Sequence, residues 1–233
     1  MVLDTIQQRI SLIEEHIHAA CERAGRKRED LSIVAVTKQV SAKRTKEAIN
    51  AGIKNVGENR PDGLLSKRSE IRDDNVKWHF IGNVQSRKVK DIINEIDVLH
   101  SLDRMSIAKE IQKRAEKIVQ CFVQVNVSGE ESKSGLHPDE LLSFIEELSN
   151  YDKIRVIGLM TMAPFTKDED LIRNVFRSLR KLRDEISSKQ FGHAPCTQLS
   201  MGMSNDYVIA IEEGATHVRI GTALVGTESE GDV

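Results

Sequence analysis

The chain of 233 residues is poor in cysteine, and its three cysteines lie far apart. Cys21, Cys121 and Cys196 have no histidine or cysteine nearby at the spacing of zinc ligands, so we expect no metal site. Their odd number, and an N-terminus without a basic segment followed by an apolar one, argue against a secreted disulfide-bonded protein. We therefore expect reduced thiols and a cytoplasmic location.

Long apolar runs and an excess of charge of one sign are also missing. No run approaches the roughly 20 residues that a membrane-spanning helix needs. Lysine and arginine together number 34 against 36 aspartates and glutamates, which gives a formal net charge of −2. Proteins that bind nucleic acid or anionic membranes concentrate positive charge, so we expect neither as a partner.

No linker rich in proline, glycine or serine divides the chain, and the four prolines stand singly. The length suits one large domain or two small ones. Without a linker, we expect a single domain over residues 1–233. Its acidic end, residues 226–233, is predicted to be a frayed tail.

The chain does contain a regular alternation of short apolar strands and amphipathic helices. Ile6, Ile10, Ile13 and Ile17 recur at helical spacing and predict an N-terminal helix. Eight strand–helix units follow, which favours an α/β fold with a single (β/α)8 TIM-type barrel and one extra N-terminal helix. A doubly wound open sheet is the alternative, but it would stop at five or six strands, and no glycine-rich dinucleotide motif follows the first strand. The predicted strands are 32–38, 55–58, 77–82, 97–100, 121–127, 155–160, 197–200 and 217–221.

A lysine stands at the end of the first predicted strand. Residues 32–38 read as a buried parallel strand, with Lys38 at its C-terminal end. Burial of an ammonium group is costly, which would favour the neutral amine that Schiff-base chemistry needs. Alternatively, Lys38 simply extends to the rim of the sheet. Taken alone, this lysine favours the second interpretation.

The loops after the seventh and eighth strands favour an anion. Residues 200–205 and 219–222 carry glycines, hydroxyls and free backbone N–H groups, and each opens a predicted helix. Each feature also has an ordinary structural explanation: Ser204 as a helix cap, Gly202 and Gly221 as turn residues, Arg219 as part of an ion pair. In a barrel, however, both loops lie at the same end as Lys38, and this is where such folds often bind phosphate. An imine-forming lysine opposite a phosphate site suggests pyridoxal 5′-phosphate (PLP).

The motifs along the chain resemble one family, the pyridoxal phosphate homeostasis proteins of the YggS/PROSC type. The resemblance spans almost the whole chain and is carried, in order, by Val36-Thr37-Lys38, Gly57-Glu58-Asn59, Trp78-His79-Phe80-Ile81-Gly82, Gln85-Ser86, Gln124-Val125-Asn126, Ser132-Lys133-Ser134-Gly135, Gly158-Leu159-Met160, Leu199-Ser200-Met201-Gly202-Met203-Ser204 and Arg219-Ile220-Gly221-Thr222. It implies a single barrel similar to the N-terminal domain of alanine racemase, which binds the cofactor as an internal aldimine.

The resemblance also implies roles for particular residues. Lys38 would be the aldimine lysine, and Ser200, Gly221 and Thr222 would hold the phosphate. Arg219 would face the pyridine nitrogen. The candidate cofactor-binding residues are Lys38, Asn59, His79, Ser200, Gly202, Arg219, Gly221 and Thr222, and none is assigned a catalytic role.

The arginine bears on what the cofactor could do. A guanidinium does not give up its proton, so it would leave the pyridine nitrogen unprotonated and the ring a weak electron sink. Racemisation also needs an acid or base on the face opposite Lys38. In alanine racemase this is a tyrosine from a second domain, whereas the two tyrosines here, Tyr151 and Tyr207, have no evident claim to the role.

We therefore expect a PLP carrier or buffer in cofactor homeostasis, without efficient catalysis. Its partners would be PLP and, as recipients, apo-enzymes that use PLP. A monomer is expected, because no second domain needs to be borrowed. An amino-acid racemase and a Schiff-base aldolase without bound cofactor remain as alternatives.

Overall fold

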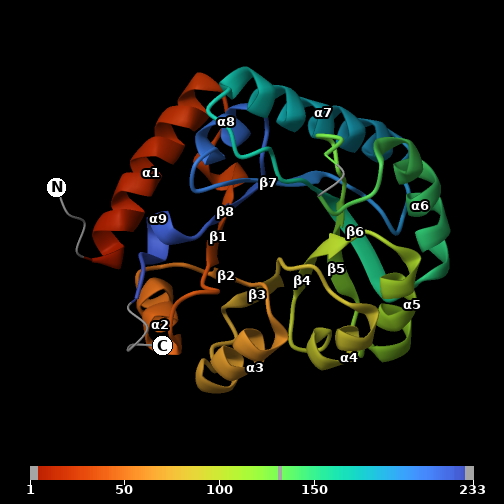
Figure 1. Cartoon of the computed structure of the whole chain (residues 1–233), viewed down its shortest axis with the longest axis horizontal. Coiled ribbons are helices and arrows are strands. Elements are labelled where there is room, and N and C mark those ends of the chain that lie inside the picture. Colours follow the sequence, from red (N-terminus) through yellow and green to blue (C-terminus); the bar gives the residue numbers. More distant parts are fainter. Residues whose placement is uncertain (1–4, 131–132, 229–233) are drawn as a thin grey trace.

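In the computed structural model, which describes residues 5–130 and 133–228, parallel strands close into a barrel in the order β1 to β8. Helices surround the ring of strands, as Figure 1 shows. The predicted (β/α)8 barrel is confirmed. The strands are β1 (Ser32–Val36), β2 (Asn55–Glu58), β3 (Lys77–Phe80), β4 (Val98–Leu102), β5 (Val119–Gln124), β6 (Ile154–Met160), β7 (Gln198–Met203) and β8 (His217–Ile220).

The extra N-terminal helix is also confirmed, as α1 (Ile6–Arg23). Its N-cap, Thr5, forms a capping box with Gln8, and its four isoleucines at helical spacing are buried against the rest of the molecule. The other helices are α2 (Ala42–Asn50), α3 (Pro61–Glu70), α4 (Val89–Ile92), α5 (Met105–Arg114), α6 (Leu141–Glu147), α7 (Glu169–Ser188), α8 (Tyr207–Glu212) and α9 (Thr222–Val225), with 3-10 turns at Arg28–Asp30, Ser86–Lys88, Pro138–Glu140 and Leu148–Asn150.

The barrel closes where its first and last strands meet. β1 pairs with β8, with Val34 opposite Arg219 and Ala35 opposite Ile220. Helix α1 lies beside α8 and α9, so the two ends of the fold are neighbours (Figure 1). Because β1 and β8 run in the same direction, the residues that follow both strands emerge at one mouth of the barrel.

Among the described residues, buried apolar side chains form two separate cores. The larger one lies between the strands and the surrounding helices, and it contains the buried face of α1 and Trp78. The smaller one, inside the barrel, consists of Val98, Phe122, Ile157 and Met160. Buried polar side chains, among them His79, His100, Ser200 and Arg219, also lie inside the barrel.

The last residues of the described chain are held in place. Of the tail predicted over 226–233, only residues 226–228 are described. The Glu228 carboxylate accepts hydrogen bonds from the Ser41 backbone nitrogen at 2.5 Å and from the Ser41 hydroxyl at 2.9 Å. Residues 229–233 lie outside the described residues. Among the helices described, none has the length and apolar character needed to span a bilayer.

Candidate functional site

A cavity of about 460 Å³ opens at the mouth where the C-terminal ends of the strands meet. Its walls come from the C-terminal ends of β1, β7 and β8 and from the segments that follow β1, β2, β3, β6, β7 and β8, so residues far apart in sequence converge there. The lining residues are Val36, Lys38, Gln39, Asn59, Ile81, Gly82, Asn83, Met162, Met203, Ser204, Asn205, Arg219, Gly221 and Thr222.

Of the predicted site residues, Lys38, Asn59, Arg219, Gly221 and Thr222 line this cavity. The predicted convergence of the lysine with the loop after β8 is therefore observed. Lys38 itself is exposed, so the expectation that burial would desolvate its amine is wrong. The lysine follows β1 by two residues, which carries its side chain out of the sheet and into the mouth.

Ser200, Gly202 and His79 are not among the lining residues. Ser200 and His79 are buried inside the barrel, at 0% and 1% exposure. Gly202 has a φ of +92°, and a Cβ atom there would lie 2.5 Å from the Cβ of Ala210 and 3.0 Å from the Cα of Tyr207. This glycine therefore allows α8 to pack closely against β7. Its position gives it a structural role.

The serine at the cavity is Ser204, which was predicted to lie in the anion-favouring loop 200–205 but was not among the candidate cofactor-binding residues. Strand β7 was expected to end at Ser200 but continues to Met203, so Ser204 is the first residue beyond it. Three further strand residues advance the chain by roughly 10 Å, which leaves Ser200 deep inside the barrel. The second hydroxyl of the Leu199–Ser204 motif was the available signal. The Ser204 Oγ accepts a hydrogen bond from the Gly221 backbone nitrogen at 3.3 Å, which ties the two loops together.

Arg219 extends from the barrel interior to the cavity. It is 4% exposed; Nη1 donates to the Ser200 Oγ at 2.6 Å and Nη2 to the Thr161 carbonyl oxygen at 3.0 Å. No carboxylate among the described residues forms an ion pair with it. Burial lowers the pKa of Arg219 to about 10, and the negative charge of Asp206 opposes this effect. The guanidinium is thus still charged at neutral pH.

Two buried histidines continue the polar interior below Arg219. The His100 Nδ1 lies 2.8 Å from the Ser200 Oγ, and its Nε2 lies 2.8 Å from the His79 Nδ1. The His79 Nε2 lies 3.1 Å from the Asn55 Oδ1. Burial holds the pKa of His79 down to about 3 and that of His100 well below its usual range. His79 is therefore brought to the site only indirectly, through His100 and Ser200.

A buried ion pair lies directly under the Lys38 segment. The Lys67 Nζ is 2.6 Å from the Glu58 Oε1, and it also donates to the carbonyl oxygen of Thr37 at 2.5 Å. The Thr37 hydroxyl donates to the same Glu58 oxygen at 2.6 Å. These contacts fix the backbone of the residue that precedes Lys38.

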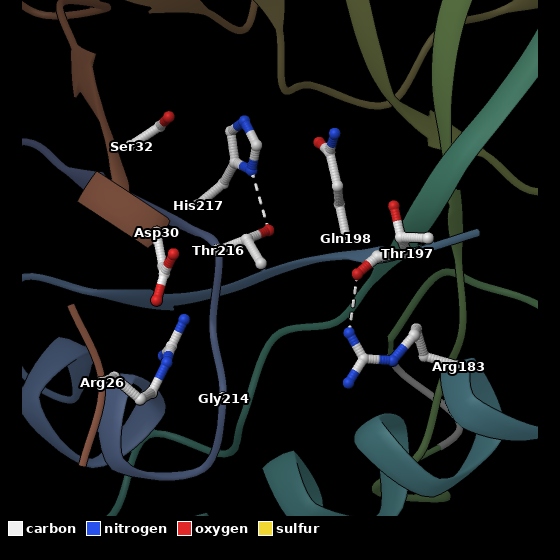
Figure 2. A pocket seen from close by; sticks show the side chains of 9 residues that line it. All are labelled: Arg26, Asp30, Ser32, Arg183, Thr197, Gln198, Gly214, Thr216 and His217. Atoms are coloured by element: carbon white, nitrogen blue, oxygen red, sulfur yellow. Dashed lines mark hydrogen bonds between the residues drawn. The ribbon is translucent and has the colours of Figure 1, made fainter. Parts of the chain in front are cut away.

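A second cavity, of about 510 Å³, lies at the opposite mouth, where β1, β7 and β8 begin (Figure 2). Its lining residues are Arg26, Asp30, Ser32, Arg183, Thr197, Gln198, Gly214, Thr216 and His217. Several of its polar groups are already engaged. Arg183 donates to the Thr197 carbonyl oxygen and His217 bonds to the Thr216 hydroxyl. Arg26 donates to the Ile211 carbonyl oxygen. Since no lysine among the described residues lines it, this cavity offers no amine for imine formation.

The chemistry of the first cavity follows from its lining residues. It presents a primary amine, a guanidinium, amides and two hydroxyls, and no acidic side chain among the described residues lines it. Such a set favours a dianionic ligand with a reactive carbonyl group. Within residues 5–130 and 133–228, no group of three or more histidines, cysteines, aspartates or glutamates is arranged to hold a metal ion.

Comparison with known proteins first defines the class of fold. The chain matches the family model described as alanine racemase, N-terminal domain, over residues 6–229. The alanine racemase of Clostridium difficile 630 superposes with a TM-score of 0.77 at 15% identity, over 99% of this chain and 59% of that chain. The molecule is thus a barrel of the alanine racemase N-terminal domain class.

Closer relatives identify the family within this class. The pyridoxal phosphate homeostasis protein of Aquifex aeolicus (strain VF5) is 44% identical over 94% of this chain and 96% of its own length. That of Escherichia coli (strain K12) is 32% identical over 96% and 97%. The structure of PipY from Synechococcus elongatus PCC7942 with PLP bound has a TM-score of 0.83 at 28% identity, over 95% of this chain and 100% of that chain. The chain belongs to the pyridoxal phosphate homeostasis protein family, as its motifs predicted.

Proposed function

We propose that this protein holds PLP in the cavity at the C-terminal mouth, as an imine on Lys38, and acts as a carrier or buffer in PLP homeostasis. The observation that supports this most is that Lys38, Arg219 and the hydroxyls of Ser204 and Thr222 line one cavity. PLP combines an aldehyde, a basic ring nitrogen and a phosphate, and each of these finds a complementary group there. The PLP-bound relative and the family name point to the same ligand.

Each lining group has a proposed role. The Lys38 Nζ adds to the aldehyde carbon of PLP, the C=N bond replaces the C=O bond, and the oxygen leaves as water. Ser204, Gly221 and Thr222 bind the phosphate through hydroxyls and backbone N–H groups. In this proposal Ser204 takes the role that the family resemblance implied for Ser200. Arg219 donates to the ring nitrogen, and Asn59 lies beside the ring.

A carrier is favoured over a racemase because the cavity lacks a second acid–base group. Among the described residues that line it, none is a histidine, tyrosine, cysteine, aspartate or glutamate. The Tyr207 hydroxyl lies outside it, 2.8 Å from the His16 Nδ1, and Tyr151 does not line it either. A donor fixed as a cation at the ring nitrogen also weakens the electron sink. We place the protein in the cytoplasm as a monomer that supplies PLP to apo-enzymes.

The lysine assignment is tested by loading purified protein with PLP and recording its visible spectrum before and after borohydride. We expect an imine band that reduction abolishes, and a pyridoxyl group on the peptide that contains Lys38. Lys38→Ala should lose both signals. Lys43→Ala, an exposed lysine of α2 nearby, should keep them. An adduct on another lysine, or a wild type that stays colourless, would contradict the assignment and favour the aldolase alternative.

Carrier and racemase are separated by two measurements on the loaded protein. We expect the loaded protein to transfer PLP to an apo-enzyme that is present in excess. The loss of the visible imine band of the loaded protein measures this transfer. We expect no exchange of the α-proton of alanine with solvent deuterium above that of free PLP. Rapid exchange would support the racemase.

A further inference from the structure

A continuous line of hydrogen bonds crosses the barrel interior from β2 to β8. It joins Arg219 to Ser200 (2.6 Å), Ser200 to His100 (2.8 Å), His100 to His79 (2.8 Å) and His79 to Asn55 (3.1 Å). We call the four residues Asn55, His79, His100 and Ser200 the histidine chain. Asn55 is half-buried, and the other three are at most 1% exposed.

Arg219 fixes the direction of every proton in this line. A guanidinium can only donate, so Ser200 accepts from it. The hydroxyl proton of Ser200 then points to the His100 Nδ1, since a buried hydroxyl proton left unpaired would be costly. No other acceptor for it is found among the described residues.

The same logic continues to the end of the line. A neutral His100 that accepts at Nδ1 carries its proton on Nε2 and donates it to the His79 Nδ1. His79 in turn carries its proton on Nε2 and donates it to the Asn55 Oδ1. The geometry therefore requires both histidines to be neutral Nε2–H tautomers, with all four hydrogen bonds pointing away from Arg219.

We propose that the histidine chain is a positioning device that holds Arg219 as a fixed, permanently charged donor at the cavity. Two contacts, with Ser200 and the Thr161 carbonyl oxygen, anchor the guanidinium from below. Of the five N–H groups of an arginine, the others remain for an acceptor in the cavity. The inference rests on the proposed function, in which that acceptor is the ring nitrogen of PLP.

Neutral histidines are essential to this arrangement. A protonated His100 would donate at both nitrogens and would set a second positive charge one hydroxyl away from the guanidinium. The pKa of His100 is held well below its usual range by burial first and then by the nearby positive charge, including that of Arg219. The line thus satisfies a buried cation without placing a carboxylate beside the cofactor.

The first test reads the tautomers in the cofactor-free protein, by long-range ¹H–¹⁵N correlation of the imidazole rings. The two signals are assigned through His79→Gln and His100→Gln, with the exposed His18 as an internal reference. We expect both rings to show a protonated Nε2 and a bare Nδ1 from pH 6 to pH 8. An Nδ1–H tautomer or a cationic ring at either position would overturn the proposal.

The second test loads the protein with PLP labelled with ¹⁵N in the ring and follows the protonation of that nitrogen. In the wild type we expect a bare nitrogen from pH 6 to pH 8. Ser200→Ala should raise its protonation midpoint by about one pH unit or more, as loss of one charge-assisted hydrogen bond implies. Ser200→Thr, which keeps a hydroxyl, should restore the wild-type value.

Phe122→Leu is the matched control, since Phe122 packs against the His100 ring with centroids 4.6 Å apart and takes no part in the line. If Phe122→Leu and Ser200→Ala shift the protonation midpoint of the ring nitrogen equally, the shift comes from disturbed core packing and not from the hydrogen-bonded line. This result would overturn the proposal. If the wild type takes up no PLP, the proposed function fails. The histidine tautomers of the cofactor-free protein then decide alone whether the histidine chain holds Arg219 in the proposed way. If PLP binds but the protonation midpoint of its ring nitrogen is the same in Ser200→Ala as in the wild type, only this inference fails.

Discussion

Beneath Lys38, the chain buries a complete ion pair rather than an apolar contact. The side chains of Lys67 and Glu58 are 8% and 1% exposed, and their charges meet at 2.6 Å. The Thr37 hydroxyl supplies a further hydrogen bond to Glu58. Removing one member of such a pair leaves the other charge buried without compensation.

Lys67→Met is therefore expected to destabilise the fold by about 3–5 kcal/mol, measured as the free energy of unfolding in urea. The double variant Lys67→Met with Glu58→Gln should recover part of this loss, because no buried charge remains. Lys117→Met is the control: Lys117 is half exposed and pairs with Asp97 at 3.1 Å, so its loss should cost less than about 1 kcal/mol. If Lys67→Met and Lys117→Met lower the free energy of unfolding equally, Lys67 and Glu58 do not act as a buried ion pair.

At the level of single residues, sequence reasoning succeeded where a side chain follows directly from the end of a strand. Lys38 and Gly221 were placed at the mouth because each lies at the end of a short apolar strand, whereas Asn59 was assigned through the family resemblance. Ser200 was misplaced because a strand end is uncertain by a few residues, and here that error moves a side chain from the mouth to the interior. Lys67 gave no signal, since a lysine in a helix is normally solvated.

At the level of elements, the strands were recognised because short apolar runs bounded by polar residues are typical of buried strands and too short for buried helices. Their ends were less certain: β7 extends to Met203, and β5 ends at Gln124 rather than at residue 127. The end of a strand depends on the hydrogen bonds made by its neighbours, and these neighbours are known only from the closed barrel. The pairing of β1 with β8, which builds the site, is of this kind.

The C-terminus of α7 allows a prediction about an element. The helix ends at Ser188, and Gln190, two residues on, has a φ of +54°. This left-handed conformation is one that glycine adopts without strain and that closes many helices. Gln190→Gly should therefore stabilise the protein by about 0.5–1 kcal/mol in urea unfolding.

A glycine one position earlier serves as the control. Lys189 has a φ of −73°, which any residue adopts, so Lys189→Gly relieves no strain and adds freedom to the unfolded chain. This variant should be destabilised by a similar amount. If both glycines shift stability in the same direction, the strain at Gln190 is not the cause.

At the scale of the whole molecule, the alternation of strands and helices was enough to predict the barrel, but its polar interior was not foreseen. The strands alternate between residues that face the helices and residues that face the barrel axis, and a sequence does not state which set is which. His79, His100 and His217 all face inward, with ring centroids 5.1–6.4 Å apart. Their meeting requires closure of β3, β4 and β8 around one axis.

These three histidines make the stability of the whole barrel depend on pH. Burial, as the largest cause, lowers the pKa of His79 to about 3 and that of His217 to about 4, against 6.5 for an ordinary histidine. The pKa of His100 lies well below its usual range for the same reason. Between these values the unfolded chain binds protons that the folded chain does not, so acid favours unfolding.

The free energy of unfolding should therefore be nearly constant between pH 7 and pH 8 and should fall as the pH drops below about 6.5 towards 5. Each buried histidine contributes a slope of up to about 1.4 kcal/mol per pH unit. Urea unfolding at half-unit steps from pH 8 to pH 5 measures this slope. His217→Leu, which removes one inward-facing imidazole, should make the slope shallower, whereas His18→Gln on the exposed face of α1 should leave it unchanged. If the free energy of unfolding has the same slope in His217→Leu as in the wild type, burial of this imidazole is not a cause of the loss of stability in acid.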